Sequence, residues 1–563
     1  MDKIWLEHYP KAVETSIELD PKESLIDYFN KKTTKYANKT AAECMGARIT
    51  YAELNTLSTK FALYCKEVLY LKKGERLGVM SPNIIQYHIV AMGALKAGLV
   101  LVGINPLYTA SELKHQILDS GLKTIVALDF FAHTIETAMK DAHIENIILL
   151  SIGGGQKPLK KFIINTVAKH IKKLIKPFNI PTAIYIKDIF KYESKTTSID
   201  IKVSGTDLAL IQYTGGTTGR PKGVMLSHGN ILANIYQVSA CMRPIMTEDE
   251  IWIAPLPLYH IFALTASFAA LNFGNKNIFI TNPRDLGGLI RTIMKSNFSI
   301  IIGVNTLFCA LANDPRFKNV NFSKLKVAWA GGMPVQEHVA KKWQEVTGCP
   351  LHVAYGLSET SPGVSADFYN TPEFSNSIGF PFPNTNVEIR DINTNQTLPI
   401  GESGEICVKG PQVSSGYWNN QSATKESIIN GWLKTGDVGV MDSKGQIKIV
   451  DRIKDMVIVS GFNVYTVEIE DIIGLIPQVL NVAVIGLPSD KSGEQLKAHV
   501  ILKPGRDITR EEIINHCRKY LTGYKIPRLI SFNEKLPLSP VGKILKSELR
   551  KLPENHKFIH KKQ

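Results

Sequence analysis

A glycine- and threonine-rich stretch at residues 213–223 constrains the fold of this chain most. It reads Tyr-Thr-Gly-Gly-Thr-Thr-Gly-Arg-Pro-Lys-Gly and follows an apolar run, 207–211, that indicates a buried strand. Glycines let a backbone approach a phosphate closely with its N–H groups turned inward, and Arg220 and Lys222 add positive charge. The spacing differs from a Walker A loop, because no Gly-Lys pair precedes Ser or Thr. The stretch predicts a phosphate-binding turn, and a plain surface turn is the alternative.

Length and charge narrow the class of protein. A chain of 563 residues is too long for one core, so two or more domains are expected. The net charge of +15 favours an anionic partner such as a nucleotide, a coenzyme or an anionic lipid. No RNA- or DNA-binding motif is found, so nucleic acid is not expected as a partner. The seven cysteines are scattered without a Cys-x-x-Cys pair, which argues against a disulfide framework and a zinc site.

Residues 50–350 alternate between helical and strand-like segments, which predicts a layered α/β domain with largely parallel sheets. After the glycine-rich stretch, residues 224–228 lead toward a helix that Ser227 would cap. The apolar run 261–273 is interpreted as a buried helix. The segments expected to be buried strands are 76–80, 99–104, 124–128, 146–150, 251–254, 277–280 and 299–302.

The pattern changes twice toward the C-terminus. Short strands and glycine turns over 385–450 predict a β subdomain. A compact α+β unit follows, with strands at 481–486 and 497–502 and a helix near 509–521. We therefore divide the chain into an N-terminal domain, 1–451, and a small mobile C-terminal domain, 452–563.

One basic segment stands apart. Residues 157–176 carry seven lysines and no acid. On a helix, apolar residues from Ile163 to Ile175 would share one arc and lysines including Lys169, Lys172, Lys173 and Lys176 the opposite arc. Such a helix suits the surface of an anionic membrane, while a docked surface helix with a solvated basic face is the simpler alternative.

Several further segments indicate a function only when they are considered together. They are Pro257-Leu-Tyr-His260, Ala330-Gly-Gly-Met-Pro334, Tyr355-Gly-Leu-Ser-Glu-Thr360, Gly431-Trp-Leu-Lys-Thr-Gly-Asp437, Asp451-Arg-Ile-Lys454, Val459-Ser-Gly-Phe-Asn463 and Pro540-Val-Gly-Lys543. Their order and spacing resemble the adenylate-forming, or AMP-binding, superfamily of acyl-CoA synthetases, adenylation domains and luciferases. The stretch 430–454 resembles the signature segment of fatty acyl-CoA synthetases.

The resemblance implies ATP-dependent activation of long-chain fatty acids to acyl-CoA through an acyl-adenylate, with release of AMP and pyrophosphate. A carboxylate is a poor acylating agent until its oxygen is bound to AMP. The acid and ATP are both anions, so the site needs cations and hydrogen-bond donors around the α-phosphate. ATP, Mg²⁺ and coenzyme A are the implied cofactors or co-substrates.

The resemblance also assigns roles to residues. Lys543 would bridge the carboxylate and the α-phosphate, His260 would face the carboxylate, and Glu359 with Thr218 would hold Mg²⁺. Asp437 would accept the ribose hydroxyls, Arg452 would support the ribose or phosphate, and adenine would lie along Gly331, Gly332 and Tyr355. The phosphate-binding residues would be Tyr213, Thr214, Gly215, Gly216, Thr217, Thr218, Gly219, Arg220, Pro221, Lys222, Gly223 and Val224, with Gly356 also near ATP.

Each of these residues has a plainer interpretation. Taken alone, Lys543 would be a solvated lysine, Glu359 a structural ion-pair member, Asp437 a turn residue and His260 a core histidine. Only their combination favours the catalytic interpretation.

In the same family the C-terminal domain rotates between the two steps. Lys454 matches the hinge, and Gly461 and Phe462 would reach the coenzyme A channel. Gly356 occupies a position where acetate-activating relatives carry a bulky ring, so a glycine there would leave an acyl tunnel open. Gly303, Val304 and Ala330 are further predicted lining.

Three other functions stay open: an acyl-AMP ligase without transfer to coenzyme A, an aryl or medium-chain acid ligase, and a non-catalytic lipid-binding protein. The N-terminus lacks the apolar core of a signal peptide, and no long apolar run is uninterrupted. We therefore expect a cytoplasmic protein, peripherally associated with the inner face of the cytoplasmic membrane. A homodimer is an open alternative to a monomer.

Overall fold

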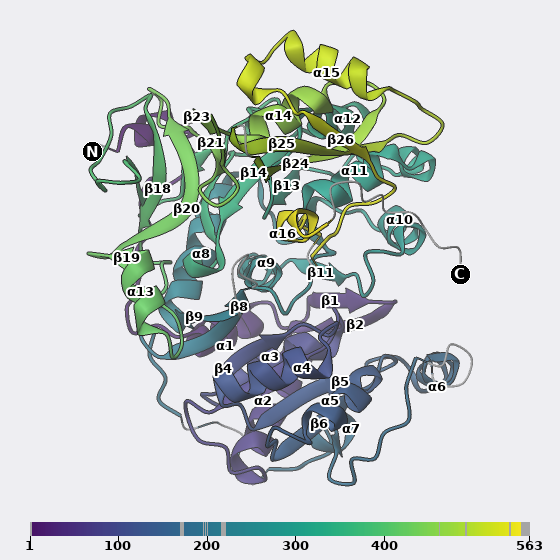
Figure 1. The fold of residues 1–563 in the computed structure, drawn as a ribbon. Coiled ribbons are helices and arrows are strands. Elements are labelled where there is room, and N and C mark those ends of the chain that lie inside the picture. The colour runs from purple at the N-terminus through teal and green to yellow at the C-terminus, as the bar shows by residue number, and fades with distance from the viewer. Residues whose placement is uncertain are drawn as a thin grey trace.

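A computed structural model describes residues 3–168, 174–194, 196, 199, 201–214, 221–460, 462–489, 492–539 and 542–552. Two sheets form the large N-terminal part, a third sheet flanks them, and a fourth belongs to the C-terminal part (Figure 1). The helices that begin before residue 300 are α1 (Leu25–Lys35), α2 (Tyr51–Glu67), α3 (Ile85–Lys96), α4 (Ala110–Ser120), α5 (Ala132–Ala138), α6 (Pro158–Thr166), α7 (Ile186–Ile189), α8 (His228–Met242), α9 (Ile261–Asn272) and α10 (Leu286–Met294). Those that follow are α11 (Asn305–Asn313), α12 (Glu337–Thr347), α13 (Gln421–Ser427), α14 (Thr466–Gly474), α15 (Arg510–Arg518) and α16 (Lys546–Arg550).

The first sheet is parallel except at one edge, where β8 and β9 run antiparallel. Its order is β7 (Ile184–Tyr185), β6 (Asn146–Leu150), β5 (Thr124–Leu128), β3 (Arg76–Met80), β4 (Val100–Ile104), β8 (Leu208–Thr214) and β9 (Lys222–Ser227). Both faces of β4 are buried. Val100, Val102 and Ile104 pack into one apolar cluster, and Leu101, on the other face, packs into the larger apolar cluster. Burial on both faces explains why these strands are continuous apolar runs in the sequence.

The second sheet lies across a layer of helices from the first. Its order is β16 (Phe380–Pro381), β15 (Gly363–Ala366), β14 (Leu351–Gly356), β13 (Val327–Gly331), β12 (Ile300–Gly303), β10 (Ile251–Ala254), β11 (Lys276–Phe279), β1 (Thr40–Cys44) and β2 (Ala47–Thr50). Every residue of α3 is buried, because this helix contacts β3 and β4 of the first sheet and β1 of the second. The two sheets therefore share one core.

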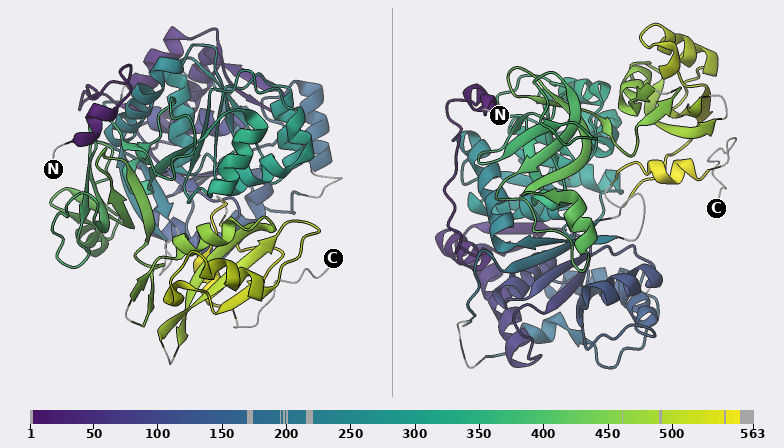
Figure 2. Two further views of the ribbon diagram at one scale, coloured as in Figure 1. Left: turned by 90° about the horizontal axis from the view of Figure 1, so that it is seen from above. Right: turned by 60° about the vertical axis from the view of Figure 1, so that its left-hand side comes forward.

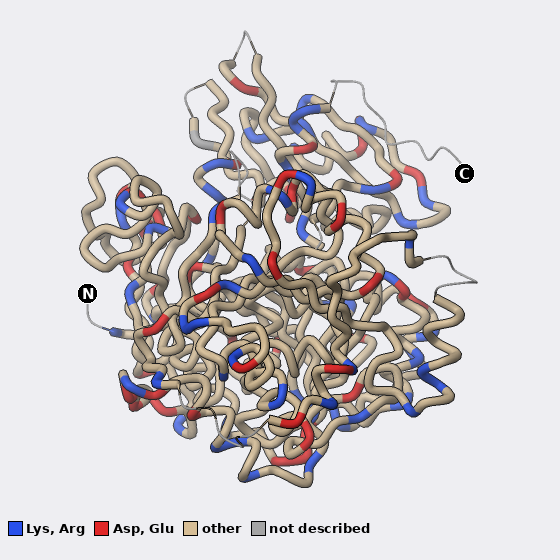
Figure 3. Tube along the Cα trace, turned by 90° about the horizontal axis from the view of Figure 1, so that it is seen from below, with Lys and Arg blue, Asp and Glu red and all other residues tan. Residues whose placement is uncertain are grey.

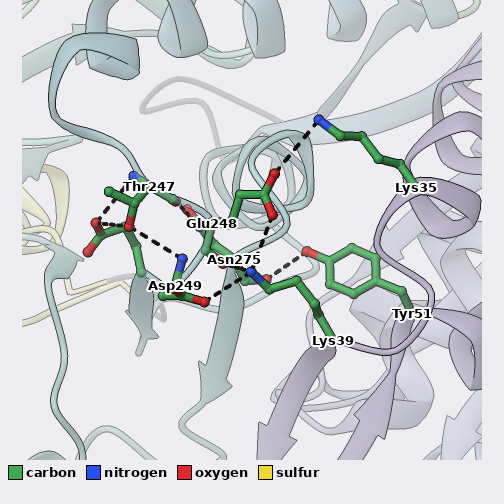
Figure 4. A network of polar contacts seen from close by, with 8 residues as sticks. Lys35, Lys39, Tyr51, Thr247, Glu248, Asp249 and Asn275 are labelled. Carbon is green, nitrogen blue, oxygen red and sulfur yellow. Dashed lines mark hydrogen bonds and ion pairs between the residues drawn. The ribbon is translucent and has the colours of Figure 1, made fainter.

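A polar network fastens the N-terminal helices to the second sheet (Figure 4). The buried Tyr51 hydroxyl donates to the Asn275 carbonyl oxygen at 2.7 Å. Lys39 Nζ lies 3.0 Å from Asp249 Oδ1, and Lys35 Nζ lies 3.9 Å from Glu248 Oε1. Exposed ion pairs contribute little, so the buried Tyr51 bond is the more important of these contacts.

The third and fourth sheets meet at the predicted domain boundary. The third comprises β17 (Asn386–Arg390), β18 (Ser403–Lys409), β20 (Trp432–Met441), β19 (Ile428–Ile429) and β21 (Ile447–Arg452). The fourth comprises β23 (Phe462–Val464), β22 (Val457–Val459), β25 (Gly493–Leu502), β24 (Val479–Ser489) and β26 (Leu529–Phe532). Only 453–456 join them, and the C-terminal part has its own apolar core and stands to one side (Figure 2). The division at 451/452 stays a prediction that this arrangement favours.

Charged residues of both signs are scattered over much of the described trace (Figure 3). All seven cysteines are free and buried. Within the described residues, no helix is both long and apolar enough to cross a membrane.

The C-terminal domain contains a nearly buried ion pair whose loss should be costly. Lys546 Nζ lies 2.7 Å from Glu470 Oε1, and both side chains are largely inaccessible. Lys546→Met would leave the Glu470 carboxylate without its partner, and we expect the free energy of unfolding of this domain to fall by about 3–5 kcal/mol. Urea unfolding followed by hydrogen exchange in β24 and β25 measures this change. The Lys546→Met/Glu470→Leu double variant should recover most of the loss, and an equally unstable double variant would contradict the argument.

Candidate active site

The glycine-rich stretch connects two antiparallel strands. Tyr213 pairs with Gly223 and Thr214 with Lys222 in the register of β8 and β9. Residues 224–228 lead into helix α8, as the sequence predicts, but residues 222–227 form strand β9, which the sequence analysis did not predict. Ser227 does cap α8, accepting a hydrogen bond from the Asn230 N–H. The predicted phosphate ligands Gly215, Gly216, Thr217, Thr218, Gly219 and Arg220 lie outside the described residues.

Tyr417 links this hairpin to Glu359. The segment around Tyr417 is hydrogen-bonded to β9, because Trp418 N donates to Gly223 O at 2.7 Å. The Tyr417 hydroxyl donates to Glu359 Oε1 at 2.8 Å, and Lys222 Nζ lies 5.2 Å from the centre of the Tyr417 ring. Glu359 Oε2 has no hydrogen-bond partner among the described residues. One oriented carboxylate linked to the hairpin of the predicted phosphate-binding stretch fits Mg²⁺, which proteins usually hold with one or two carboxylates and substrate phosphates.

Asp437 is fixed by two neighbours. On the paired strands β20 and β21 it lies opposite Arg452, whose Nε donates to Asp437 Oδ1 at 2.7 Å. The buried Tyr355 hydroxyl donates to Asp437 Oδ2 at 2.7 Å. Burial and the Asp437 charge raise the pKa of Tyr355 well above its usual value, so this hydroxyl stays a donor. Each carboxylate oxygen keeps a further lone pair that a ribose hydroxyl could use.

Lys543 reaches the same place from the C-terminal domain. Its turn is attached to the large domain by Thr306 Oγ1, which donates to Gly542 O at 3.2 Å. A Cβ atom on Gly332 would lie 3.5 Å from Lys543 Cε. Burial, then repulsion from Arg452, lower the pKa of Lys543 to about 8, although Asp437 and Glu359 oppose that shift. The structure therefore brings together Lys543, Glu359, Asp437 and Arg452 from four separate segments.

His260 completes this group as a neutral donor. Burial and the nearby Lys543 charge lower the pKa of His260 to about 3. Its Nδ1 accepts a hydrogen bond from Phe262 N at 3.3 Å, so the neutral ring carries its proton on Nε2. His260 also ends the loop that packs on the first sheet, where a Cβ on Gly103 would collide with the Tyr259 carbonyl oxygen.

The predicted tunnel residues differ in which parts of the chain they contact. Gly303 and Ala330 are register partners on β12 and β13, and Val304 lies beside the Lys543 turn. The structure gives a reason for glycine at Gly356 other than the predicted open acyl tunnel. A Cβ there would collide with the Pro362 carbonyl oxygen, where β14 and β15 approach at a register shift. The close approach of two backbones requires this glycine, so a bulky residue would disrupt the strand pair before it blocked a tunnel.

The sequence analysis also predicted a hinge residue and a coenzyme A contact segment. Lys454 is in the 453–456 connection between the third and fourth sheets, as a hinge residue would be. Phe462 is 55% exposed and stacks on Tyr524 with ring centres 4.7 Å apart. Gly461 lies outside the described residues.

The sequence analysis did not single out Tyr417 or Thr306, although both residues form hydrogen bonds in the candidate site. Tyr417 is 58 positions from the Glu359 it binds, and Thr306 is 236 positions from Gly542. No local pattern connects such residues. Thr306 is the second residue of α11, two positions after the predicted tunnel residue Val304.

Comparison with known proteins agrees with this geometry. Residues 29–418 match the AMP-binding enzyme family, and residues 468–543 match the AMP-binding enzyme C-terminal domain. The chain belongs to the AMP-binding enzyme family. The predicted resemblance is thereby confirmed.

Relatives within the family match from end to end. A long-chain-fatty-acid–CoA ligase of Escherichia coli O6:H1 is 45% identical over 552 residues, with 98% of both chains covered. Proteins of the same name from Haemophilus influenzae and Bacillus subtilis are 41% and 35% identical, covering 98% of this chain and 98% and 99% of their own.

Solved structures confirm the predicted fold class, a large α/β domain with a β subdomain and a small α+β domain. ATP-bound MatB from Rhodopseudomonas palustris has a TM-score of 0.80 at 28% identity, covering 93% of this chain and 98% of its own. The anthranilate CoA ligase AuaEII, in complex with anthranoyl-AMP, has a TM-score of 0.83 at 22% identity, with 94% of this chain and 97% of its own covered, and supports the fold alone.

The lowered pKa of Lys543 predicts a pH dependence for this AMP-binding enzyme. The ammonium form is the one that can stabilise an anionic transition state, and it is lost as pH rises through about 8. We expect adenylate formation, measured as pyrophosphate release under limiting substrate, to fall above that pH. Lys543→Arg should be slower but should lose this fall, because a guanidinium stays charged. If the activity of Lys543→Arg fell above this pH as the activity of the parent does, the titrating group would be a residue other than Lys543.

Proposed function

We propose that this chain is a long-chain fatty-acid–CoA ligase that converts a fatty acid, ATP and coenzyme A to acyl-CoA, AMP and pyrophosphate. The observation that carries the proposal is the location of Lys543, a lysine of the small domain, among Glu359 and Asp437 of the large domain and Arg452 at the predicted domain boundary. Full-length relatives named long-chain-fatty-acid–CoA ligases support the same activity.

In the first step, a carboxylate oxygen of the fatty acid attacks the α-phosphorus of ATP and pyrophosphate leaves. Lys543 and Arg452 offset the charge of the two approaching anions. The neutral His260 donates its Nε2 proton in a hydrogen bond to the acid without being ionised itself. The hairpin end between β8 and β9 binds the β- and γ-phosphates, and Mg²⁺, held by Glu359 and Thr218, would offset their charge.

The nucleoside lies on the other side of Lys543. Asp437, already oriented by Tyr355 and Arg452, accepts the ribose hydroxyls. Adenine lies along Gly331 and Gly332, next to the buried Tyr355.

In the second step, the thiolate of coenzyme A attacks the acyl carbon and AMP leaves. Lys543 occupies the space that the incoming thiol needs, so the small domain turns about 453–456 before this step. That rotation withdraws Lys543 and brings Gly461 and Phe462 toward the pantetheine arm.

The acyl chain extends between α9 and the second sheet. A narrow, largely apolar cavity lies there, bordered by Ala254, Leu256, Ala263, Ala266 and Ile302. Two of its bordering residues are close in sequence to predicted site residues: Ala263 lies three positions after His260, and Ile302 directly precedes Gly303. Its volume of about 20 Å³ suffices for one water molecule. A long chain therefore enters by widening the space between α9 and the strands.

We also propose a location in the cell for this enzyme. Long-chain acids partition into bilayers, so the enzyme takes its substrate at the inner face of the cytoplasmic membrane as a peripheral protein.

Assays with acids from acetate to arachidate, each with and without coenzyme A, test the activity. We expect AMP release to be greatest with long chains and to depend on coenzyme A. AMP release independent of coenzyme A would identify an acyl-AMP ligase, a preference for benzoate or hexanoate would identify an aryl or medium-chain ligase, and no release would indicate a non-catalytic binding protein.

Lys543→Ala should separate the two half-reactions. Adenylate formation should fall by about two orders of magnitude or more, the loss expected for one charge-stabilising group. Conversion of synthetic acyl-AMP and coenzyme A to thioester should persist, because Lys543 has left the site by then. Equal loss in both half-reactions would contradict separate conformations.

Ala266→Leu should shorten the preferred chain. The added methyl groups would enter the cavity between α9 and β12, so palmitate activity should fall more than octanoate activity. Initial rates across the chain-length series measure the shift, and Ala266→Ser, which keeps the size, is the matched control. Unchanged chain-length preference in a folded Ala266→Leu enzyme would show that the chain runs elsewhere.

A further inference from the structure

Helix α6 carries three large apolar side chains into solvent. Leu159 is 74% exposed, Phe162 is 68% exposed and Ile163 is 52% exposed. Their spacing of three and four residues places them on one face of the helix. Figure 1 shows α6 at the edge of the molecule, beyond the first sheet.

Polar contacts hold α6 in this orientation. Lys160 Nζ donates to the Met45 carbonyl oxygen at 2.7 Å, and Asn165 Oδ1 accepts from Gly153 N at 2.9 Å. The Gln156 side chain just before the helix donates to Cys44 O at 3.2 Å, and Ala168 just after it is buried. The helix is therefore attached by its polar side and its C-terminal end, and the apolar face points outward.

This arrangement corrects the predicted amphipathic helix over 157–176. Element α6 covers only Pro158–Thr166, and the backbone from Leu174 to Lys176 is not helical. The predicted arc placed Ile163 and Ile164 together, whereas Ile164 is partly buried and Ile163 points outward with Leu159 and Phe162. Lys169, Lys172 and Lys173 lie outside the described residues.

We propose that the face formed by Leu159, Phe162 and Ile163 inserts into an anionic lipid bilayer. The proposal rests on the proposed function, because a bilayer is where long-chain acids reside. Charge favours this occupant: the sequence has no acidic residue between Glu145 and Asp188, and Lys157, Lys160 and Lys161 are close to the apolar residues along the chain. Exposed apolar side chains in a basic segment suit the boundary between anionic headgroups and acyl chains.

The same charges disfavour a second copy of the chain on this face. A symmetric contact through α6 would bring two sets of lysines together without any acid from the segment to compensate. Met45, 40% exposed and hydrogen-bonded to Lys160, extends the apolar surface toward the β1–β2 turn.

A fluorescent label can report insertion directly. Because all seven native thiols are buried, Phe162→Cys can be labelled selectively with an environment-sensitive dye. Leu118→Cys on α4, where the native leucine is 58% exposed, is the matched control. We expect phosphatidylglycerol vesicles at low salt to shift the dye at 162 to the blue and leave the dye at 118 unchanged. If the emission of the dye at 162 shifted to the blue with rising protein concentration in the absence of vesicles, the face would bind a second copy of the chain. That result would overturn the proposal.

Vesicle co-sedimentation of the unlabelled protein gives the second measurement. Leu159→Ser/Phe162→Ser should lower partitioning by at least about tenfold, the scale of losing one or two buried apolar side chains, whereas Leu118→Ser should not. Adenylation of soluble octanoate should be equal in all variants. Equal sedimentation of parent and double variant would overturn the proposal. If the parent adenylates no fatty acid, the proposed function fails while the vesicle result still decides the membrane contact.

Discussion

The buried Lys543 ammonium lies where the small domain meets the large one, among charges of both signs. Burial and Arg452 disfavour the ammonium, and Asp437 and Glu359 favour it, which leaves its pKa at about 8. In the proposed mechanism, ATP and a fatty acid bring further negative charge to this point and so stabilise the arrangement in which Lys543 lies in the site. Departure of pyrophosphate removes part of that charge. We infer that the electrostatic balance couples each chemical step to the position of the small domain.

The domain junction suits such movement because many of its contacts are polar. Thr306 binds the Gly542 carbonyl, Gln336 lies 3.5 Å from Asn481, and Thr466 Oγ1 donates to Asp451 Oδ2 at 2.9 Å. Polar groups regain hydrogen bonds to water when they separate, so opening costs less than parting two apolar surfaces. The small domain keeps its own apolar core throughout, formed around β24 and β25.

Much of the fold was predictable because the buried strands are nearly pure apolar runs. The strands predicted at 76–80, 124–128, 146–150 and 251–254 have the same bounds in the structure. Strand β9 was not predicted, since Lys222–Ser227 contains a lysine, a glycine and a serine and follows Pro221. Its pairing with β8 depends on a hairpin that the sequence pattern does not specify.

The site was predictable only through the family resemblance. Lys543, Glu359, Asp437 and His260 are separated by long stretches of chain, and nothing local relates them. Contacts that depend on the particular packing, such as Tyr417 on Glu359, were missed. On α6, helical periodicity indicated an amphipathic segment but could not tell which side the polar contacts with Met45 would attach.

In the proposed mechanism, chain-length selection follows from how α9 packs. The face of this helix toward β10 and β12 carries Ala263 and Ala266, and small residues let a helix approach strands closely. The cavity between them is consequently too small for an acyl chain at rest. Each methylene that enters gains burial but must displace the helix further from the sheet. The preferred length is the one at which these two free energies balance, so selectivity depends on the compliance of α9 rather than on a fixed stop at Gly356.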